Sequence, residues 1–258
     1  IDLSVGSVLA LLGVLLSMAV REWGAPGFAA VLLVIGAAMG LGWLHGFLVA
    51  RVRIQPFIVT LCGLLFYRGL ARFIADDETK GFGDAAGLER LQSLATGNLL
   101  GVPMPFVLLI AVSALMWVLI PRSVYGRYLF AVGNNEDAAR YSGINSKRMI
   151  ASAYIVCAAL AGIAAVIFAF YTNSVSPSSH GNFFELYGIA AAVLGGCSLR
   201  GGEGSIVGIL LGTALLQVLQ NLVNLLGIPS SLNFAVMGAV ILIGVLAEQL
   251  LKRKKGKA

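Results

Sequence analysis

Residues Tyr125–Arg148 read YGRYLFAVGNNEDAARYSGINSKR, and this segment is the longest polar island between apolar runs that also carries a clear excess of Lys and Arg. Most of the remaining chain is apolar enough to lie in lipid. A basic segment between two apolar runs is typical of a loop on the cytoplasmic side of a membrane. The island therefore predicts a fold in which apolar segments cross a bilayer and this segment faces the cell interior.

The composition supports lipid as the solvent for most of the surface. Of the 258 residues, 59% are hydrophobic and 12% are charged, and the mean hydropathy is +0.91. Soluble domains carry roughly 25% charged residues. A soluble protein with a large core would expose more charge than this chain has, so the composition favours a membrane protein.

Eight apolar segments are predicted, which indicates an all-α polytopic membrane protein with about eight transmembrane or re-entrant helical segments in a single transmembrane domain over 1–258. The segments are approximately 3–20, 28–50, 56–75, 104–120, 149–171, 184–199, 206–226 and 231–250. The sixth is short and contains glycine, so it either spans the membrane as a broken helix or re-enters it.

The charges of the connecting loops predict the orientation of the chain. The loop at about 121–148 has five basic and two acidic residues, whereas 76–90 has five acidic and two basic residues. The positive-inside rule places the first loop and the basic tail at 252–258 in the cytoplasm, and the acidic stretch outside. Arg68 and Arg72 fit this bias less well, and they could reach the headgroups or pair with the acidic loop.

The island contains the signals of a short helix. Asn134–Asp137 offers capping oxygens and acidic residues at a helix start, and Gly143 is a plausible stop. Tyr141 and Ile144 would add apolar side chains for a partner. A soluble ATP-hydrolysing subunit that drives a membrane pump must push on such a helix. The alternative is a solvated linker without a partner, and the pattern alone does not separate the two.

The seventh apolar segment carries a stripe of polar residues on one helical face. These residues are Thr213, Gln217, Gln220, Asn221 and Asn224. Amides inside a membrane are costly unless they are satisfied, so this face should meet protein or water. It could line a pathway for a hydrophilic solute, or it could form hydrogen bonds between helices.

The sequence gives no sign of catalysis, a metal or a cofactor. Its three cysteines form no C-x-x-C pair, and His45 and His180 are far apart in the chain. The glycine-rich stretch 195–205 lacks the phosphate-binding lysine loop and indicates a tight turn. Asp2 precedes the first apolar run, where capping is favoured over a role in a pathway. Energy for active transport would therefore have to come from another chain or an ion gradient.

Four motifs together resemble the membrane permease subunit of bacterial ABC importers for monosaccharides of the ribose, xylose and galactose type. The motifs are IDLSVGS at Ile1–Ser7, IQPFIVTLCGLLFYRGL at Ile54–Leu70, YGRYLFAVGNNEDAARYSGIN at Tyr125–Asn145 and AAVLGGCSLRGGEGSIVGILLGTALLQVLQN at Ala191–Asn221. The resemblance runs along nearly the whole chain. Cys197 departs from the family pattern, in which a small residue such as Thr often occurs.

The resemblance implies a non-enzymatic permease of the bacterial inner membrane that forms a translocation pathway for a pentose or hexose. It implies three protein partners, namely a second permease subunit, a cytoplasmic ATP-binding subunit and a periplasmic sugar-binding protein. It also implies that about two N-terminal spans precede this sequence. The ATP-binding subunit would dock on Gly133, Asn135, Glu136, Ala138, Ala139, Gly143 and Ile144. The alternative function is a transporter or channel for a small hydrophilic solute that needs no ATPase.

Overall fold

The computed structural model describes the whole chain except residues 84–87, 230–231, 233–234, 237, 240–241 and 243–258. The described chain forms two compact units, residues 1–185 and 186–258. The predicted basic tail at 252–258 and most of the eighth apolar segment, 231–250, lie outside the described residues.

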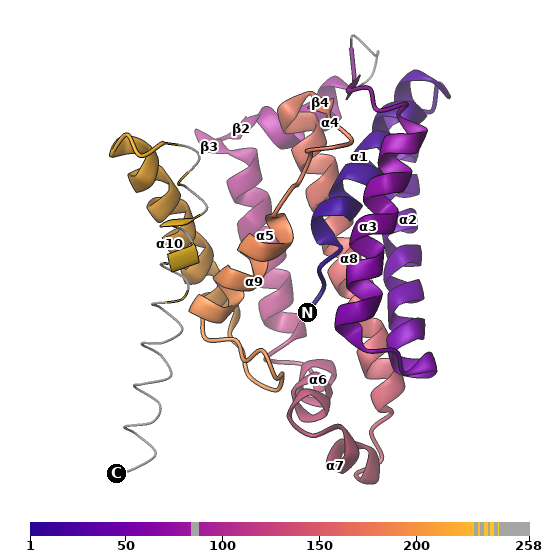
Figure 1. The fold of residues 1–258 in the computed structure, drawn as a ribbon, viewed down its shortest axis with the longest axis vertical. Helices are drawn as coiled ribbons and strands as arrows, with labels where there is room; N and C mark the ends of the chain where they lie inside the picture. Colours follow the sequence, from indigo (N-terminus) through magenta and orange to yellow (C-terminus); the bar gives the residue numbers. More distant parts are fainter. Residues whose placement is uncertain (84–87, 230–231, 233–234, 237, 240–241, 243–258) are drawn as a thin grey trace. The chain divides into compact units, whose positions relative to one another are not determined.

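The first unit consists mainly of helices (Figure 1). They are α1 Val5–Arg21, α2 Gly27–Phe47, the π-helical turn η1 Leu48–Val52, α3 Pro56–Ile74, α4 Glu89–Thr96, α5 Met104–Leu119, α6 Val124–Asn134, α7 Glu136–Tyr141 and α8 Ser146–Thr172. Four short strands form two antiparallel pairs, β1 Lys80–Gly81 with β4 Ser174–Val175, and β2 Asn98–Leu99 with β3 Val102–Pro103. Helix α9, Phe184–Leu194, begins at the end of this unit, and α10 is Ile206–Leu225.

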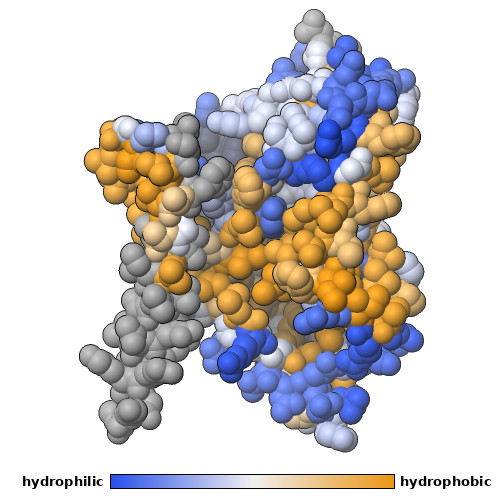
Figure 2. Space-filling view, viewed as in Figure 1, coloured by the Kyte–Doolittle hydropathy of each residue, from blue (hydrophilic) through white to orange (hydrophobic). Residues whose placement is uncertain are grey.

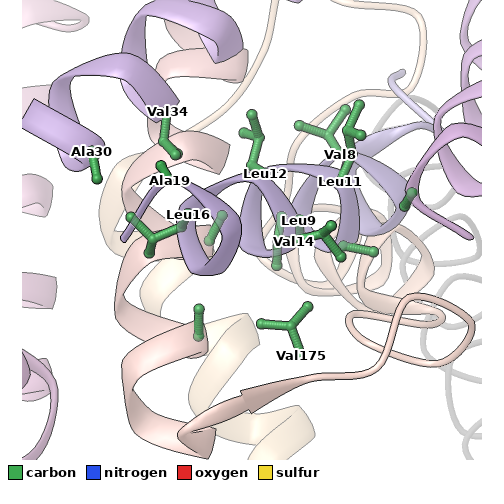
Figure 3. Packing of buried hydrophobic residues seen from close by; sticks show 14 of the residues in the cluster. Val8, Leu9, Leu11, Leu12, Val14, Leu16, Ala19, Ala30, Val34 and Val175 are labelled. Carbon is green, nitrogen blue, oxygen red and sulfur yellow. The ribbon is translucent and has the colours of Figure 1, made fainter. Parts of the chain in front are cut away.

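Helix α1 forms the centre of the first unit. Its side chains are buried on all sides, and leucine and valine residues dominate its packing (Figure 3). Leu12 and Leu16 are fully buried, and Val34 of α2 and Val175 of β4 belong to the same cluster. A helix that is apolar all round is stable when other protein elements surround it. The sequence signal for a membrane span in 3–20 therefore marks a helix that is covered largely by protein.

Small residues bring α2 and α8 into close contact. A Cβ atom placed on Gly42 would lie 2.6 Å from the Cβ atom of Ala158, and one placed on Gly46 would lie 2.7 Å from the Cα atom of Ala151. Such close approach lets helices associate in lipid, where hydrophobicity gives no driving force. By contrast, a Cβ atom on Gly36 or Gly40 would have no described atom within 4 Å. Gly42 and Gly46 therefore lie at the contact with α8, whereas Gly36 and Gly40 do not face a described neighbour.

Among the described residues, four helical segments are long and apolar enough to cross a membrane, or five if the bent pair α5–α6 counts as one span. The four are 27–52, Pro56–Ile74, Ser146–Thr172 and Ile206–Leu225. Figure 2 shows apolar side chains gathered over the helices of the first unit, with polar side chains at both ends. The described residues thus form a mostly helical membrane protein with helices at seven of the eight predicted segments. Because only four or five of these helical segments can span a bilayer, the predicted count of about eight is not confirmed.

Helix α9 is too short to cross a bilayer by itself. Its 11 residues extend about 16 Å at about 1.5 Å per residue, whereas the hydrocarbon core is about 30 Å thick. In the second unit the chain turns sharply after it, with Gly196, Gly201 and Gly202 at positive φ. This supports the re-entrant interpretation of 184–199, and the predicted tight turn in 195–205 is confirmed.

The two helical parts of the second unit pack through backbone contact. A Cβ atom on Gly208 would overlap the carbonyl oxygen of Gly195, and one on Gly212 would overlap the carbonyl oxygen of Ala191. Ala191 and Leu216 form a small apolar cluster beside this contact. Gly208 and Gly212 therefore form the close-packing side of α10.

Candidate functional site

The short helix predicted inside the polar island is present as α7. The side-chain oxygen of Asn135 accepts a hydrogen bond of 3.0 Å from the backbone N–H of Ala138, which caps the helix. Glu136 and Asp137 occupy the first turn, where negative charge suits the helix dipole. Gly143 has a φ of +85°, a conformation that ends helices and that glycine adopts without strain. The predicted helix start and stop are confirmed.

Helix α6 brings α7 to one end of the first unit. The axes of α5 and α6 differ by 76°, and the side chain of Ser123 caps the start of α6 by accepting from the N–H of Gly126. A Cβ atom on Gly126 would overlap the carbonyl oxygen of Ile120, so the bend requires glycine at this position. In Figure 1, α6 and α7 lie at the end of this unit opposite to β4 and α4.

The residues predicted to dock a partner face in two directions. Asn135, Ala138 and Gly143 are exposed, whereas Gly133, Glu136, Ala139 and Ile144 are partly or fully buried. Tyr141 ends α7 with 84% of its surface exposed, the largest apolar side chain that this helix presents. The outer surface of α7 thus combines polar backbone-capping groups with one exposed aromatic ring.

Glu136 holds α7 against the rest of the unit. Its Oε1 atom accepts a hydrogen bond of 2.8 Å from Nη1 of Arg53 and another of 3.1 Å from the hydroxyl of Ser146. Arg53 follows the π-helical turn η1, and Ser146 begins α8. One carboxylate oxygen therefore links α7 to the α2–α3 connection and to α8, the longest described helix of the unit.

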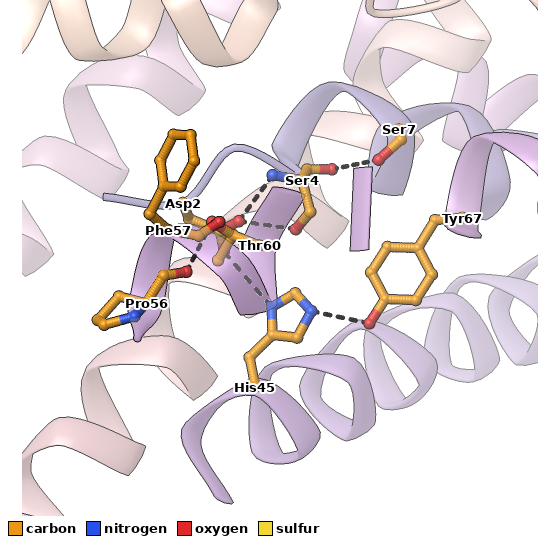
Figure 4. A network of polar contacts seen from close by, with 8 residues as sticks. All are labelled: Asp2, Ser4, Ser7, His45, Pro56, Phe57, Thr60 and Tyr67. Carbon is orange, nitrogen blue, oxygen red and sulfur yellow. Dashed lines mark hydrogen bonds and ion pairs between the residues drawn. The ribbon is translucent and has the colours of Figure 1, made fainter. Parts of the chain in front are cut away.

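A second polar network lies among α1, α2 and α3 (Figure 4). The hydroxyl of Tyr67 lies 2.8 Å from Nε2 of His45, and Nδ1 of His45 lies 3.8 Å from Oδ2 of Asp2. The other oxygen of Asp2 accepts hydrogen bonds from the backbone N–H and the hydroxyl of Ser4. His45 and Tyr67 are 4% and 3% exposed.

The sequence predictions missed most of this network. Asp2 was expected to cap the first helix, but its carboxylate bonds to Ser4 ahead of that helix and faces His45. The sequence signal that could have indicated this network is His45, a histidine inside an apolar run, because a polar side chain in a membrane needs a partner. Which residue would supply that partner depends on packing among three helices.

Arg68 holds the segment between β4 and α9. Its Nη1 atom donates to the carbonyl oxygens of Pro177 and His180, at 3.1 and 2.9 Å. Arg68 therefore contacts backbone carbonyl oxygens of this segment, and its predicted contact with headgroups stays a prediction. Arg72 does pair with the acidic loop, since it donates two hydrogen bonds to Asp77, and these hold the pKa of Asp77 below its usual value.

The segment that Arg68 holds contains a buried histidine. Burial, followed by the charge of Arg68, lowers the pKa of His180 to about 4. The ring lies against Phe168, with the two ring centroids 4.3 Å apart. Within the described residues, Nε2 of His180 and Oε2 of Glu185 are buried without a hydrogen-bond partner. Both lie near α1, since Gly13 approaches the ring of His180 and Gly6 approaches Glu185.

The polar stripe predicted on the seventh segment lies on α10. Thr213, Gln217, Asn221 and Asn224 are exposed within their own unit, and Gln220 is half-buried. The buried face of α10 consists instead of Gly212, Leu216 and Val223. The stripe is thus a separate face from the one that packs in this unit, and its role as a pathway lining stays a prediction.

Comparison with known proteins gives a family for this arrangement. A family model described as the permease component of the branched-chain amino acid transport system matches residues 1–245. The chain is 38% identical to the ribose import permease protein of Haemophilus influenzae, over 99% of this chain and 78% of that protein. No solved structure gives a significant match.

Other relatives carry the names of permeases for other sugars. A fructose import permease protein of Bifidobacterium longum is 32% identical over 94% of this chain and 68% of its own length. A D-allose transport system permease protein of Escherichia coli is 31% identical over 98% of this chain and 76% of its own length. Because the match covers nearly the whole chain and its apolar helices agree with it, this chain belongs to the permease component family of branched-chain amino acid type transport systems.

Proposed function

We propose that this chain is the membrane permease of an ATP-binding-cassette importer for a monosaccharide. The relatives are named for import of ribose, fructose and D-allose, which are all small polyhydroxylated solutes. Such solutes need a polar route through lipid. Affinity for the sugar would lie mainly in an external binding protein, and the permease would provide the route.

The docking helix α7 carries this proposal. It is a short, capped helix at one end of a bundle of membrane helices, and a carboxylate, Glu136, fixes it to two of its neighbours. An ATP-hydrolysing subunit in the cytoplasm would press on its outer surface at Asn135, Ala138 and Tyr141. ATP hydrolysis would take place on that subunit, so this chain itself catalyses no reaction. The orientation follows the positive-inside rule, with α7 and the C-terminus in the cytoplasm.

The route for the sugar would run beside the polar stripe of α10. Thr213, Gln217 and Asn221 present hydroxyl and amide groups on a face that does not pack within its own unit. A second permease subunit would complete the enclosure, as expected for an importer that alternates between inward-open and outward-open forms.

The proposal is tested by removing the exposed aromatic ring of the docking helix. The permease, its ATP-binding subunit and the solute-binding protein are produced together, and co-purification of the ATP-binding subunit is measured for wild type and Tyr141→Ala. Ribose uptake into proteoliposomes is measured in parallel. We expect at least a five-fold loss of association, since a central aromatic contact often contributes about 2 kcal/mol or more to an interface.

Tyr171→Ala is the matched control, because Tyr171 is also an exposed tyrosine but lies at the C-terminal end of α8. The control should associate normally. Normal association of Tyr141→Ala would remove the docking helix from the proposal. Full ribose uptake by the purified permease without an ATP-binding subunit would favour the alternative, an ATPase-independent transporter or channel.

A further inference from the structure

The docking helix makes one long-range contact that the function proposed above does not require. Oε1 of Glu136 binds Nη1 of Arg53, although the two residues are 83 positions apart in the chain. The side chain of Arg53 is 47% exposed and that of Glu136 is 33% exposed. Exposed ion pairs contribute little to stability. The pair matters here for its position, because it joins α7 to the connection between α2 and α3.

The third member of the contact restricts the pair further. Ser146 is buried, and its hydroxyl donates to the same oxygen of Glu136 that Arg53 binds. Ser146 opens α8, whose N-cap is Asn145. Two donors from different elements thus hold the carboxylate of Glu136. These two hydrogen bonds limit the rotamers that its side chain can adopt.

Arg53 stands at an irregular point of the backbone. It follows the π-helical turn η1, and its own φ is +68°, in the left-handed region that is costly for residues other than glycine. Its backbone N–H bonds to the carbonyl of Leu48, and that of Ile54 bonds to the same carbonyl. π-Helical turns are rare, and they often occur at functional positions.

The π-helical turn leads directly to the buried polar network. His45 lies in the last turn of α2, ahead of η1, and its ring contacts Asp2 before α1 and Tyr67 of α3. The backbone N–H of Leu48, the first residue of η1, donates to the carbonyl oxygen of His45, and the N–H of Arg53 donates to the carbonyl oxygen of Leu48. The path from α7 to the centre of the first unit thus passes through the Glu136–Arg53 pair, along η1, and on to His45.

We propose that Arg53 is a positioning residue that transmits movement of the docking helix to the α2–α3 connection through its ion pair with Glu136. This inference rests on the proposed function, in which an ATP-binding subunit moves α7. A contiguous set of contacts does not by itself show coupling, so the pair must be tested as a pair.

The experiment uses the complete transporter in proteoliposomes, with its ATP-binding subunit and a ribose-loaded binding protein. Arg53→Gln, Glu136→Gln, the double variant Arg53→Gln/Glu136→Gln and Arg53→Lys are compared with wild type. Association of the ATP-binding subunit, ATP hydrolysis and ribose uptake are measured on each sample. Size-exclusion profiles identify any variant that does not fold, and Arg53→Lys tests the contact with the charge retained.

We expect Arg53→Gln to bind the ATP-binding subunit as wild type does. Its ribose uptake per ATP hydrolysed should fall about five-fold or more, a typical size for coupling between sites. Arg53→Lys should recover at least half of the lost coupling. The double variant should lose no more coupling than the more impaired of the two single variants, because both single variants remove the same interaction. Arg72→Gln, which breaks the exposed pair with Asp77 at the other end of α3, should leave coupling unchanged.

Two results would overturn the inference. One is that Arg53→Gln takes up as much ribose per ATP hydrolysed as wild type. The other is that the fold-loss of coupling in the double variant equals the product of the fold-losses in the two single variants. Either result leaves the docking proposal intact if Tyr141→Ala still loses association. If Tyr141→Ala keeps its association while Arg53→Gln is uncoupled, the docking proposal fails instead.

Discussion

The hydroxyl of Tyr67 lies 2.8 Å from Nε2 of His45, which joins α3 to the last turn of α2 inside the membrane part of the protein. The two rings also stack, with centroids 5.6 Å apart. Neither side chain has appreciable contact with solvent. The pair therefore fixes the relative positions of two helices whose connection carries Arg53.

Tyr67→Phe should destabilise the protein while leaving its shape unchanged. The substitution leaves a buried nitrogen of His45 without a partner, which costs about 1–3 kcal/mol. The thermal unfolding midpoint in detergent, followed by tryptophan fluorescence, should fall. Tyr171→Phe is the control, because that tyrosine is 65% exposed. Equal midpoints for the two variants would mean that the hydroxyl of Tyr67 does not stabilise the fold.

Gly42→Ala and Gly40→Ala should have opposite effects on stability. A methyl group on Gly42 meets Ala158 and the carbonyl oxygen of Tyr154, so the α2–α8 contact must open, at a cost of about 1–3 kcal/mol. A methyl group on Gly40 meets no described atom and should stabilise the helix by roughly 0.5–1 kcal/mol. Unfolding midpoints of the two variants check this, and loss of stability in both would contradict the packing described for α2.

Arg68→Gln should loosen the segment between β4 and α9. The variant loses the donor of two hydrogen bonds, and the carbonyl oxygens of Pro177 and His180 are then left partly unsatisfied. Hydrogen–deuterium exchange across 176–184 should become faster by at least about ten-fold, the factor that about 1.4 kcal/mol produces. Arg72→Gln serves as the control, and equal exchange in both variants would contradict the role of Arg68.

His180 should make the fold sensitive to acid. Its folded pKa is lowered to about 4, so the unfolded chain takes up a proton near the ordinary value of 6.5 while the folded protein does not. Stability from this residue is complete above about pH 6.5 and is lost as the pH falls toward 4, at up to about 1.4 kcal/mol per pH unit. Unfolding midpoints at pH 7.5 and 5.0 should differ less in His180→Gln than in wild type. An equal drop in both would show that other groups cause it.

The stripe on α10 should be accessible to water if it lines the sugar route. In a background with Cys62, Cys157 and Cys197 replaced by alanine, a cysteine introduced at Gln217 should react with a membrane-impermeant thiol reagent. A cysteine introduced at Val218, on a neighbouring apolar face of the same helix, should react at least about ten-fold more slowly, because a thiol in lipid is rarely ionised. Equal rates at the two positions would favour hydrogen bonding between helices as the role of the stripe.

The sequence by itself determined the local features of this protein. The cap at Asn135, the stop at Gly143 and the tight turn in 195–205 follow from residue chemistry within a few positions, because capping and turn formation involve only neighbouring backbone groups. The apolar runs likewise fixed where the helices lie. The membrane class and the family resemblance could also be recognised from composition and sequence motifs alone.

Only the tertiary structure decided which residues meet across the chain. Helix α2 is apolar over almost its whole surface, so no polar face marks that Gly42 meets α8 while Gly40 does not. From its sequence position Arg68 could bind lipid headgroups or the acidic loop. Packing instead placed its guanidinium at the carbonyl oxygens of Pro177 and His180. The partners of Glu136 and His45 were decided in the same way, because an ion pair or a buried hydrogen bond depends on the distance between atoms, and that distance is set by how all the helices fit together.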